Sequence, residues 1–229
     1  MEIMKRANER SAADETASSS TVTRWLLALG ILVAPVFLGV AIIQILTRPG
    51  FDIRHLAISS LSLGDLGWIQ IANFEVTGLL AIACAVGVRR ALRGGRGGTW
   101  GPVLIGILGI GTIISGIFHP DPALGFPPGA PTGMPATMSV HATIHEIASM
   151  ASFASLTAAC FVLSRAFASA GRGKWAIYCI ASGVLMPVLL VLGLSSRDWV
   201  GVFLAVMIAV GFGCISATSA RLRAGVSKA

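Results

Sequence analysis

Six apolar stretches, each long enough to cross a bilayer, constrain the fold of this 229-residue chain more than any other feature. A helix needs roughly 20 apolar residues to span the hydrocarbon core. The stretches begin at Trp25 and cover about 25–47, 67–88, 100–119, 138–163, 175–195 and 199–220. Inside lipid every backbone N–H and C=O group has to be satisfied within the segment itself, which favours helices. The sequence therefore predicts an all-α, polytopic integral membrane protein with six transmembrane helices.

The composition supports a membrane class and argues against a nucleic-acid partner. Hydrophobic residues make up 55% of the chain and charged residues only 12%, whereas a soluble domain carries about 25% charged residues. The net charge of +7 is not gathered on one domain but falls in short runs between the apolar stretches. We expect a disordered cytosolic tail over 1–23, the transmembrane domain over 24–220, and a second cytosolic tail over 221–229.

The distribution of basic residues predicts how the helices are oriented. The two tails, Arg24 directly after the first of them, and the loops 89–96 and 165–174 hold 14 of the 17 Lys and Arg residues. The remaining loops hold only Arg48, Arg54 and Arg197. Because loops rich in Lys and Arg stay on the cytoplasmic side, both termini are predicted to lie inside. The predicted location is the inner, cytoplasmic membrane of the cell, crossed several times.

Ionisable groups gather at the predicted outer ends of the spans. Glu75 and Glu146 each lie about eight residues inside the outer end of a span, roughly 12 Å deep at 1.5 Å per residue. Such groups are costly at membrane depth and generally mark a site. The histidines share this outer side; they are His55, His119, His141 and His145. We therefore predict a His/Asp/Glu/Ser pocket in the outer leaflet.

Three segments are expected to form this pocket. The stretch 51–68 is too polar to span and too apolar for a free loop, so it should lie at the interface and present Ser59. The third span ends at His119, where Pro120 stops the helix and Asp121 follows. The fourth span opens with two histidines on one helical face. Six of the ten prolines lie within 120–135, and this stiff loop is expected to cover the pocket.

Together these segments resemble the membrane-protein family catalogued as domain of unknown function 998, over roughly residues 30–220. The resemblance rests on four segments of the chain, which are 55–64 (HLAISSLSLG), 73–78 (NFEVTG), 116–121 (GIFHPD) and 141–145 (HATIH). It implies a six-helix protein with a serine in the first outer loop, here Ser59. It also implies a Gly-x-Phe-x-x-Asp end to the third span, here Gly116, Phe118 and Asp121. The family has one histidine opening the fourth span, whereas this chain has two, and the family carries no activity over to this protein.

The leading functional hypothesis is a metal-dependent enzyme that acts on a membrane lipid or isoprenoid. His141 and His145 are spaced i, i+4, as a helix presents two imidazoles to one zinc ion. His119 or Asp121 would complete three protein ligands and leave an open position for water. Glu146 and Glu75 are candidate proton carriers, and Ser59 completes the candidate catalytic residues.

Two other functional classes remain open at this stage. In a proton-coupled transporter, Glu75 and Glu146 would share a proton, because two like charges in low dielectric do not both ionise. In a non-enzymatic lipid-binding or sensing protein, the polar groups would hold helices together and contact a lipid headgroup. A haem carrier, with His119 and His141 flanking the haem, is a further option. The sequence leaves the oligomeric state open.

Overall fold

The structure, a computed structural model, describes residues 18–196 and 198–226. This part of the chain contains six helices long and apolar enough to cross a membrane. They are Ser18–Thr47, whose second part is α2 (Val33–Thr47), then α3 (Gly67–Ala91), α4 (Trp100–Ile117), α5 (Val140–Ser169), α6 (Gly173–Ser195) and α7 (Val200–Val226). A short 3-10 helix, η1 (Ile58–Ser62), lies between α2 and α3. The prediction of an all-α fold with six spanning helices is confirmed.

Several helices are longer than the apolar stretches that predicted them. Helix continues over 18–23 and 221–226, two ranges that we had expected to be tails. The added turns are stabilised by polar contacts that an apolar count does not register: Thr23 Oγ1 donates to Ser19 O at 2.9 Å, and Arg90 Nε donates to Thr23 Oγ1 at 3.0 Å. The rest of the predicted tails, 1–17 and 227–229, lies outside the described residues.

The first spanning helix is interrupted by a turn at Leu32. Pro35 follows three residues later and has no backbone N–H, so it cannot bond to the carbonyl one turn before it. The chain resumes as α2, where Val36 N donates to Leu32 O at 3.0 Å. Such kinks are tolerated in membrane helices because neighbours satisfy the released groups. Here Ser216 Oγ, on α7, accepts from Ala34 N at 3.0 Å.

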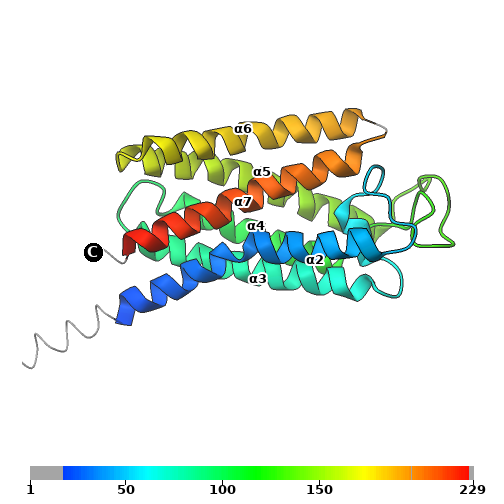
Figure 1. The fold of residues 1–229 in the computed structure, drawn as a ribbon, viewed down its shortest axis with the longest axis horizontal. Helices are drawn as coiled ribbons and strands as arrows, with labels where there is room; N and C mark the ends of the chain where they lie inside the picture. The colour runs from blue at the N-terminus through cyan, green and yellow to red at the C-terminus, as the bar shows by residue number, and fades with distance from the viewer. Residues whose placement is uncertain (1–17, 197, 227–229) are drawn as a thin grey trace, which may run out of the picture.

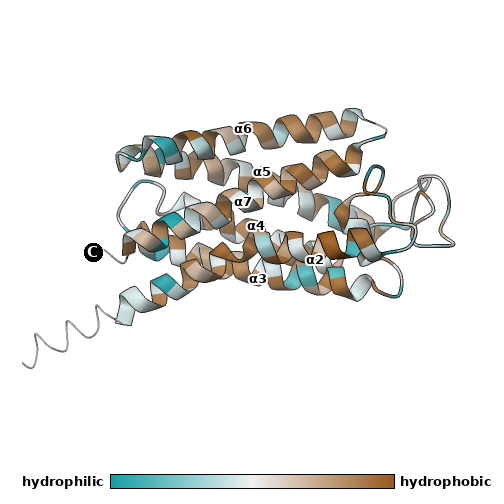
Figure 2. Ribbon diagram, viewed as in Figure 1, coloured by the Kyte–Doolittle hydropathy of each residue, from teal (hydrophilic) through white to brown (hydrophobic). Residues whose placement is uncertain are grey.

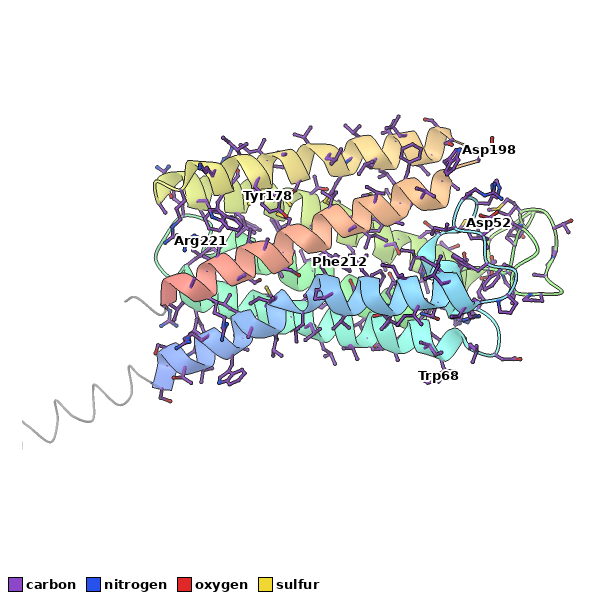
Figure 3. The ribbon with its side chains drawn as sticks, viewed as in Figure 1. Asp52, Trp68, Tyr178, Asp198, Phe212 and Arg221 are labelled. Carbon is purple, nitrogen blue, oxygen red and sulfur yellow. The ribbon has the colours of Figure 1, made fainter. Side chains whose placement is uncertain are left out.

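The helices form a closed ring in which each one packs against its neighbours in sequence. α2 packs on both α3 and α7 and thereby closes the ring. The beginning of the first helix and the end of α7 lie at one end of the bundle (Figure 1), which we call the terminus end. The loops 48–66 and 118–139 lie at the opposite end, which we call the site end. In Figure 3, Asp52, Trp68 and Asp198 lie at the site end and Arg221 lies at the terminus end.

The outer surface of the ring is suited to lipid. Hydrophobic residues cover the middle of the helices, and hydrophilic residues concentrate towards the ends and in the loops (Figure 2). Exposed tryptophans border this apolar band: Trp25 and Trp100 towards the terminus end, Trp68 and Trp199 at the site end. Trp and Tyr are enriched at the two membrane interfaces, so this distribution is typical of a protein that crosses the bilayer.

Small residues allow α3 and α4 to approach closely. A Cβ placed on Gly78 would lie 2.7 Å from Gly109 O, and one on Gly109 would lie 2.8 Å from Gly78 O. Small residues at helix contacts are the usual means of packing in membranes, where van der Waals contact replaces the hydrophobic effect between helices. This contact fixes α4 against α3 and so sets where the C-terminal end of α4 lies at the site end.

The orientation of the bundle remains a prediction that cysteine labelling tests. The native cysteines Cys84, Cys160, Cys179 and Cys214 are buried, so we expect them not to react with a membrane-impermeant maleimide. A single cysteine introduced within 122–134 should be labelled from outside in intact cells. One within 93–97 should be labelled only after the membrane is permeabilised, because basic loops stay in the cytoplasm. Labelling at 93–97 in intact cells would show that the predicted orientation is wrong.

Candidate functional site

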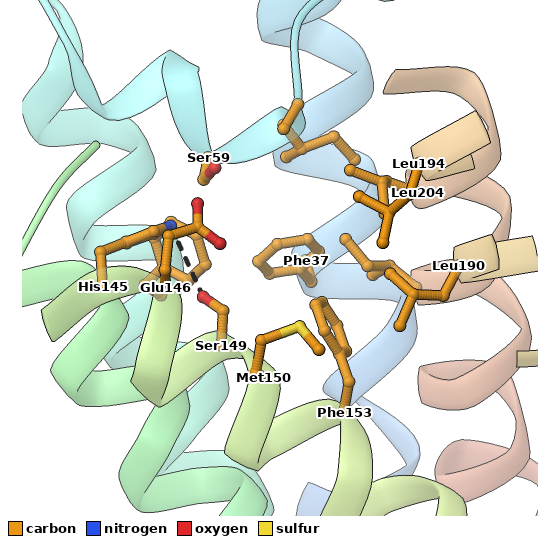
Figure 4. A pocket seen from close by; sticks show the side chains of 14 residues that line it. Phe37, Ser59, His145, Glu146, Ser149, Met150, Phe153, Leu190, Leu194 and Leu204 are labelled. Carbon is orange, nitrogen blue, oxygen red and sulfur yellow. Dashed lines mark hydrogen bonds between the residues drawn. The ribbon is translucent and has the colours of Figure 1, made fainter. Parts of the chain in front are cut away.

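A cavity of about 120 Å³ lies inside the ring at the site end. Four of the side chains that line it carry polar groups; they are Ser59, His145, Glu146 and Ser149. The opposite part of the wall is aromatic and aliphatic, and includes Phe37, Phe153, Leu190 and Leu204. Figure 4 shows the two groups facing each other across the cavity. The first helix, η1, α3, α5, α6 and α7 therefore enclose a space with one polar and one apolar side.

His145 is the polar residue that the fold holds most firmly. Its side chain is 2% exposed, and Nδ1 lies 3.0 Å from Ser115 O and 2.8 Å from Phe118 O. The last carbonyls of a helix have no partner within the helix, and α4 ends at Ile117. His145 satisfies two carbonyls at this end. A carbonyl only accepts hydrogen bonds, so Nδ1 carries the proton and Nε2 of the neutral ring is the acceptor.

Two serines lie beside His145, and one of them, Ser149, lines the cavity. Ser149 Oγ lies 3.5 Å from His145 Nε2 and 3.0 Å from Ser115 Oγ. Ser115 and Ser149 were not among the predicted catalytic or metal-binding residues. The i, i+4 spacing of His145 and Ser149 was visible in the sequence, but serines at this spacing are equally common in plain helix contacts. Only the packing of α4 against α5 brings Ser115 to both of them.

His119 and His141 meet elsewhere at the site end. Their ring centroids lie 5.4 Å apart, and the His141 ring is 5.1 Å from that of Phe118. Asp121 Oδ2 accepts from Ser139 N at 2.8 Å, one residue before α5 begins. Hydrogen bonds from the Ser139 side chain and backbone hold the pKa of Asp121 below its ordinary value. Asp121 thus ties the end of α4 to the start of α5.

The four predicted metal ligands have different immediate partners. His119 and His141 face each other, and both lie close enough to Asp121 to interact with its carboxylate electrostatically. One oxygen of Asp121 accepts from a backbone N–H, and the Nδ1 atom of His145 is taken up by two carbonyls. In residues 18–196 and 198–226, no three His, Cys, Asp or Glu side chains are placed to hold a metal ion. The i, i+4 spacing predicted a shared centre, but residues on one face of a helix can still bond to different neighbours.

Two of the three candidate catalytic residues line the cavity, and the third does not. Ser59 and Glu146 line the cavity. Glu75 instead lies against α4, with Oε1 only 2.7 Å from where a Cβ on Gly116 would be. This oxygen is buried and has no hydrogen-bond partner among the described residues. The missing side chain of Gly116 therefore provides the space for the Glu75 carboxyl group.

The cavity is covered by η1, which Arg48 anchors. The guanidinium donates from Nη1 to Leu61 O at 3.1 Å and from Nη2 to Leu63 O at 2.6 Å. The proline-rich loop 120–135 was expected to cover the pocket, but it packs against the loop 48–66. Its buried Phe126 contacts the Phe51 ring at 5.3 Å and lies 5.5 Å beneath the Arg48 guanidinium. A buried aromatic ring and a cation stabilise one another in this arrangement.

Comparison with known proteins gives a family for this chain. No curated protein and no solved structure matches it. The model of the family described as "Protein of unknown function (DUF998)" matches residues 31–221, which include all the site residues described above. Because that match covers most of the chain, the protein belongs to the DUF998 family.

Proposed function

We propose that this protein binds an amphiphilic ligand from the membrane, with the polar head of the ligand at Ser59, Glu146 and Ser149. The observation that carries the proposal is the division of one cavity wall into a polar and an apolar part. Ligand sites in proteins are mostly apolar with a few placed polar groups that fix orientation. A bilayer supplies molecules of this kind at high local concentration.

The size of the cavity indicates how much of the ligand enters it. Sites for drug-sized molecules occupy about 300–1,000 Å³, whereas this cavity measures about 120 Å³. It accommodates a small head and the first carbons of a chain, and the rest of the chain would lie along the apolar surface of the helices. A single-chain lipid or an isoprenoid alcohol has this shape.

The charge of the cavity indicates the kind of head. Glu146 is the acidic residue in the lining, and no Lys or Arg belongs to the lining residues that the structure describes. Phosphate is generally bound by Arg, Lys or helix N-termini. A neutral hydroxyl or a cationic amine, either of which can donate to a carboxylate, fits this lining better. The preferred ligand is therefore an amphiphile with an alcohol or amine head.

Binding of three dodecyl amphiphiles to the purified protein in lipid nanodiscs tests the proposal. We expect dodecylamine and dodecanol to bind. Dodecyl phosphate should bind at least about tenfold more weakly, because its phosphate is repelled by Glu146. A tenfold loss of affinity requires only about 1.4 kcal/mol of repulsion. The Glu146→Gln variant should lose most of the preference for the amine over the phosphate. Equal binding of all three ligands by the native protein and by this variant would contradict the proposal.

A cavity-filling variant separates binding in the cavity from adsorption to the apolar surface. Leu190→Trp places a large ring in the cavity wall and should abolish dodecylamine binding. Leu192→Trp lies on the same helix two residues away, where the native leucine is 46% exposed, and should leave binding unchanged. If both variants bind like the native protein, the ligand does not use the cavity.

A further inference from the structure

We propose that Ser149 is a nucleophile and His145 its general base, and that together they cleave an ester or amide bond of an amphiphile held in the cavity. The inference rests on the proposed function, because the substrate is the same class of ligand with an acyl group added. Both side chains line the cavity, so the hydroxyl and the imidazole face the place where such a ligand would lie (Figure 4).

The tautomer of His145 suits it to accept a proton from Ser149. Two backbone carbonyls occupy Nδ1, which leaves the lone pair of Nε2 directed towards Ser149 Oγ at 3.5 Å. Serine is a weak nucleophile until an adjacent base takes its proton. In ligand-free structures such hydrogen bonds are often long and tighten when substrate binds. Ser149 and His145 are therefore arranged as a serine–histidine dyad, with Nε2 of the imidazole facing the hydroxyl.

The C-terminal end of α4 has the role that a carboxylate has in a serine–histidine–aspartate triad. The third group of a triad orients the imidazole and stabilises the imidazolium that forms during the reaction. Here Ser115 O and Phe118 O orient the ring from a helix C-terminus. The macrodipole gives such a terminus a partial negative charge, which faces the imidazolium that forms during the reaction. The Phe74 ring contacts the imidazole edge-on at 6.3 Å and limits its rotation.

Ser115 is a positioning residue for both partners. Its carbonyl accepts from His145 Nδ1, and its hydroxyl lies 3.0 Å from Ser149 Oγ. When Ser149 donates to His145 Nε2, the Ser115 hydroxyl is left to donate to Ser149 Oγ. This directs the Ser149 hydroxyl hydrogen towards the imidazole. The Ser115 side chain itself is buried, so it acts through Ser149 and does not meet the ligand.

The reaction balances with water as the only co-reactant. Ser149 Oγ forms a bond to the acyl carbon while its proton passes to His145 Nε2. The bond from that carbon to the leaving oxygen or nitrogen breaks, and the proton on Nε2 transfers to the leaving alcohol or amine. Water then attacks the acyl-serine and gives its proton to Nε2, which returns it to Ser149 Oγ as the carboxylic acid departs. The products are a fatty acid and an amphiphile with a free hydroxyl or amine.

Labelling with an alkyl fluorophosphonate tests the dyad, because this reagent phosphonylates serines that an adjacent base activates. The full-length protein in nanodiscs should gain one adduct, located on Ser149 by peptide mass spectrometry. Ser149→Ala should remove the adduct, and His145→Gln should slow labelling about a hundredfold, the contribution typical of a general base. Ser115→Ala should slow labelling while dodecylamine binding stays unchanged. Ser152→Ala, one turn along the same helix and bonded to Ala148 O, should label like the native protein.

The outcomes distinguish this inference from the proposed function. If dodecylamine binds as expected but Ser149 gains no adduct, the dyad is overturned and the binding function stands. If an adduct forms equally fast in His145→Gln, the histidine is not the base and the inference is also overturned. If His145→Gln does not fold, the Ser115→Ala variant decides: a labelling rate equal to that of the native protein overturns the inference. If Ser149 is labelled but dodecylamine does not bind, the dyad stands and the proposed choice of headgroup fails.

Discussion

Replacing Arg48 with alanine is expected to lower the free energy of unfolding by about 3 kcal/mol or more. The side chain is 9% exposed, and its guanidinium bonds to the carbonyls of Leu61 and Leu63. Each hydrogen bond to a charged group contributes about 1.5–3 kcal/mol, and a buried carbonyl left without a donor adds a further penalty. Burial lowers the pKa of Arg48 from its usual value, but a guanidinium stays charged throughout the accessible pH range.

Arg54→Ala is the matched control in the same loop. Arg54 is exposed and its guanidinium pairs with Asp52, which is exposed on the same surface. Pairs of this kind contribute at most about 1 kcal/mol, so thermal or denaturant unfolding of this variant should resemble that of the native protein. Arg48→Lys retains the charge but loses the planar guanidinium with its several donors. Its free energy of unfolding should lie between those of Arg48→Ala and Arg54→Ala. Equal effects of Arg48→Ala and Arg54→Ala would show that Arg48 does not anchor η1.

Gly201→Ala is the second substitution with a large expected effect, because it separates α7 from the loop that leads to η1. A Cβ at this position would overlap the carbonyl oxygens of Ile53 and Leu56, and Gly201 N donates to Arg54 O at 3.2 Å. Backbone atoms cannot rotate away as a side chain does, so the loop has to shift. Overpacking of this kind costs about 1–3 kcal/mol. We also expect weaker dodecylamine binding, since Ala57 and Ser59 follow that loop into the cavity wall.

Gly213→Ala provides the control on the same helix. A Cβ on Gly213 meets nothing within 4 Å, and alanine is the better helix former by about 1 kcal/mol in the interior of a helix. This variant should unfold at the same denaturant concentration as the native protein or at a higher one, and should bind dodecylamine unchanged. If Gly201→Ala behaves like Gly213→Ala in both measurements, the loop does not depend on its contact with α7.

The division of the cavity wall was only partly predictable. Glu146 and Ser59 were expected at a shared pocket because carboxylates are costly in lipid and because the loop 51–68 is too polar to span. Their presence in the lining agrees with that reasoning. The apolar half of the wall was not expected, because Phe37, Leu190 and Leu204 come from three helices with no pattern to distinguish them from residues that face lipid. The same hydrophobic residue types occur in a cavity wall and on a lipid-facing surface, so residue type does not distinguish the two.

The sequence alone determined the number of spanning helices, their approximate positions and the concentration of histidines at one end. These properties follow from local chemistry, since the length of an apolar run decides whether a helix can cross a bilayer. The partners of each polar group were decided only by the tertiary structure. His141 and His145 share a helical face, yet one meets His119 and the other meets the carbonyls at the end of α4. The spacing of residues on a helix fixes their direction, but the glycine contact between α3 and α4 and the packing of α4 on α5 decide which groups they reach.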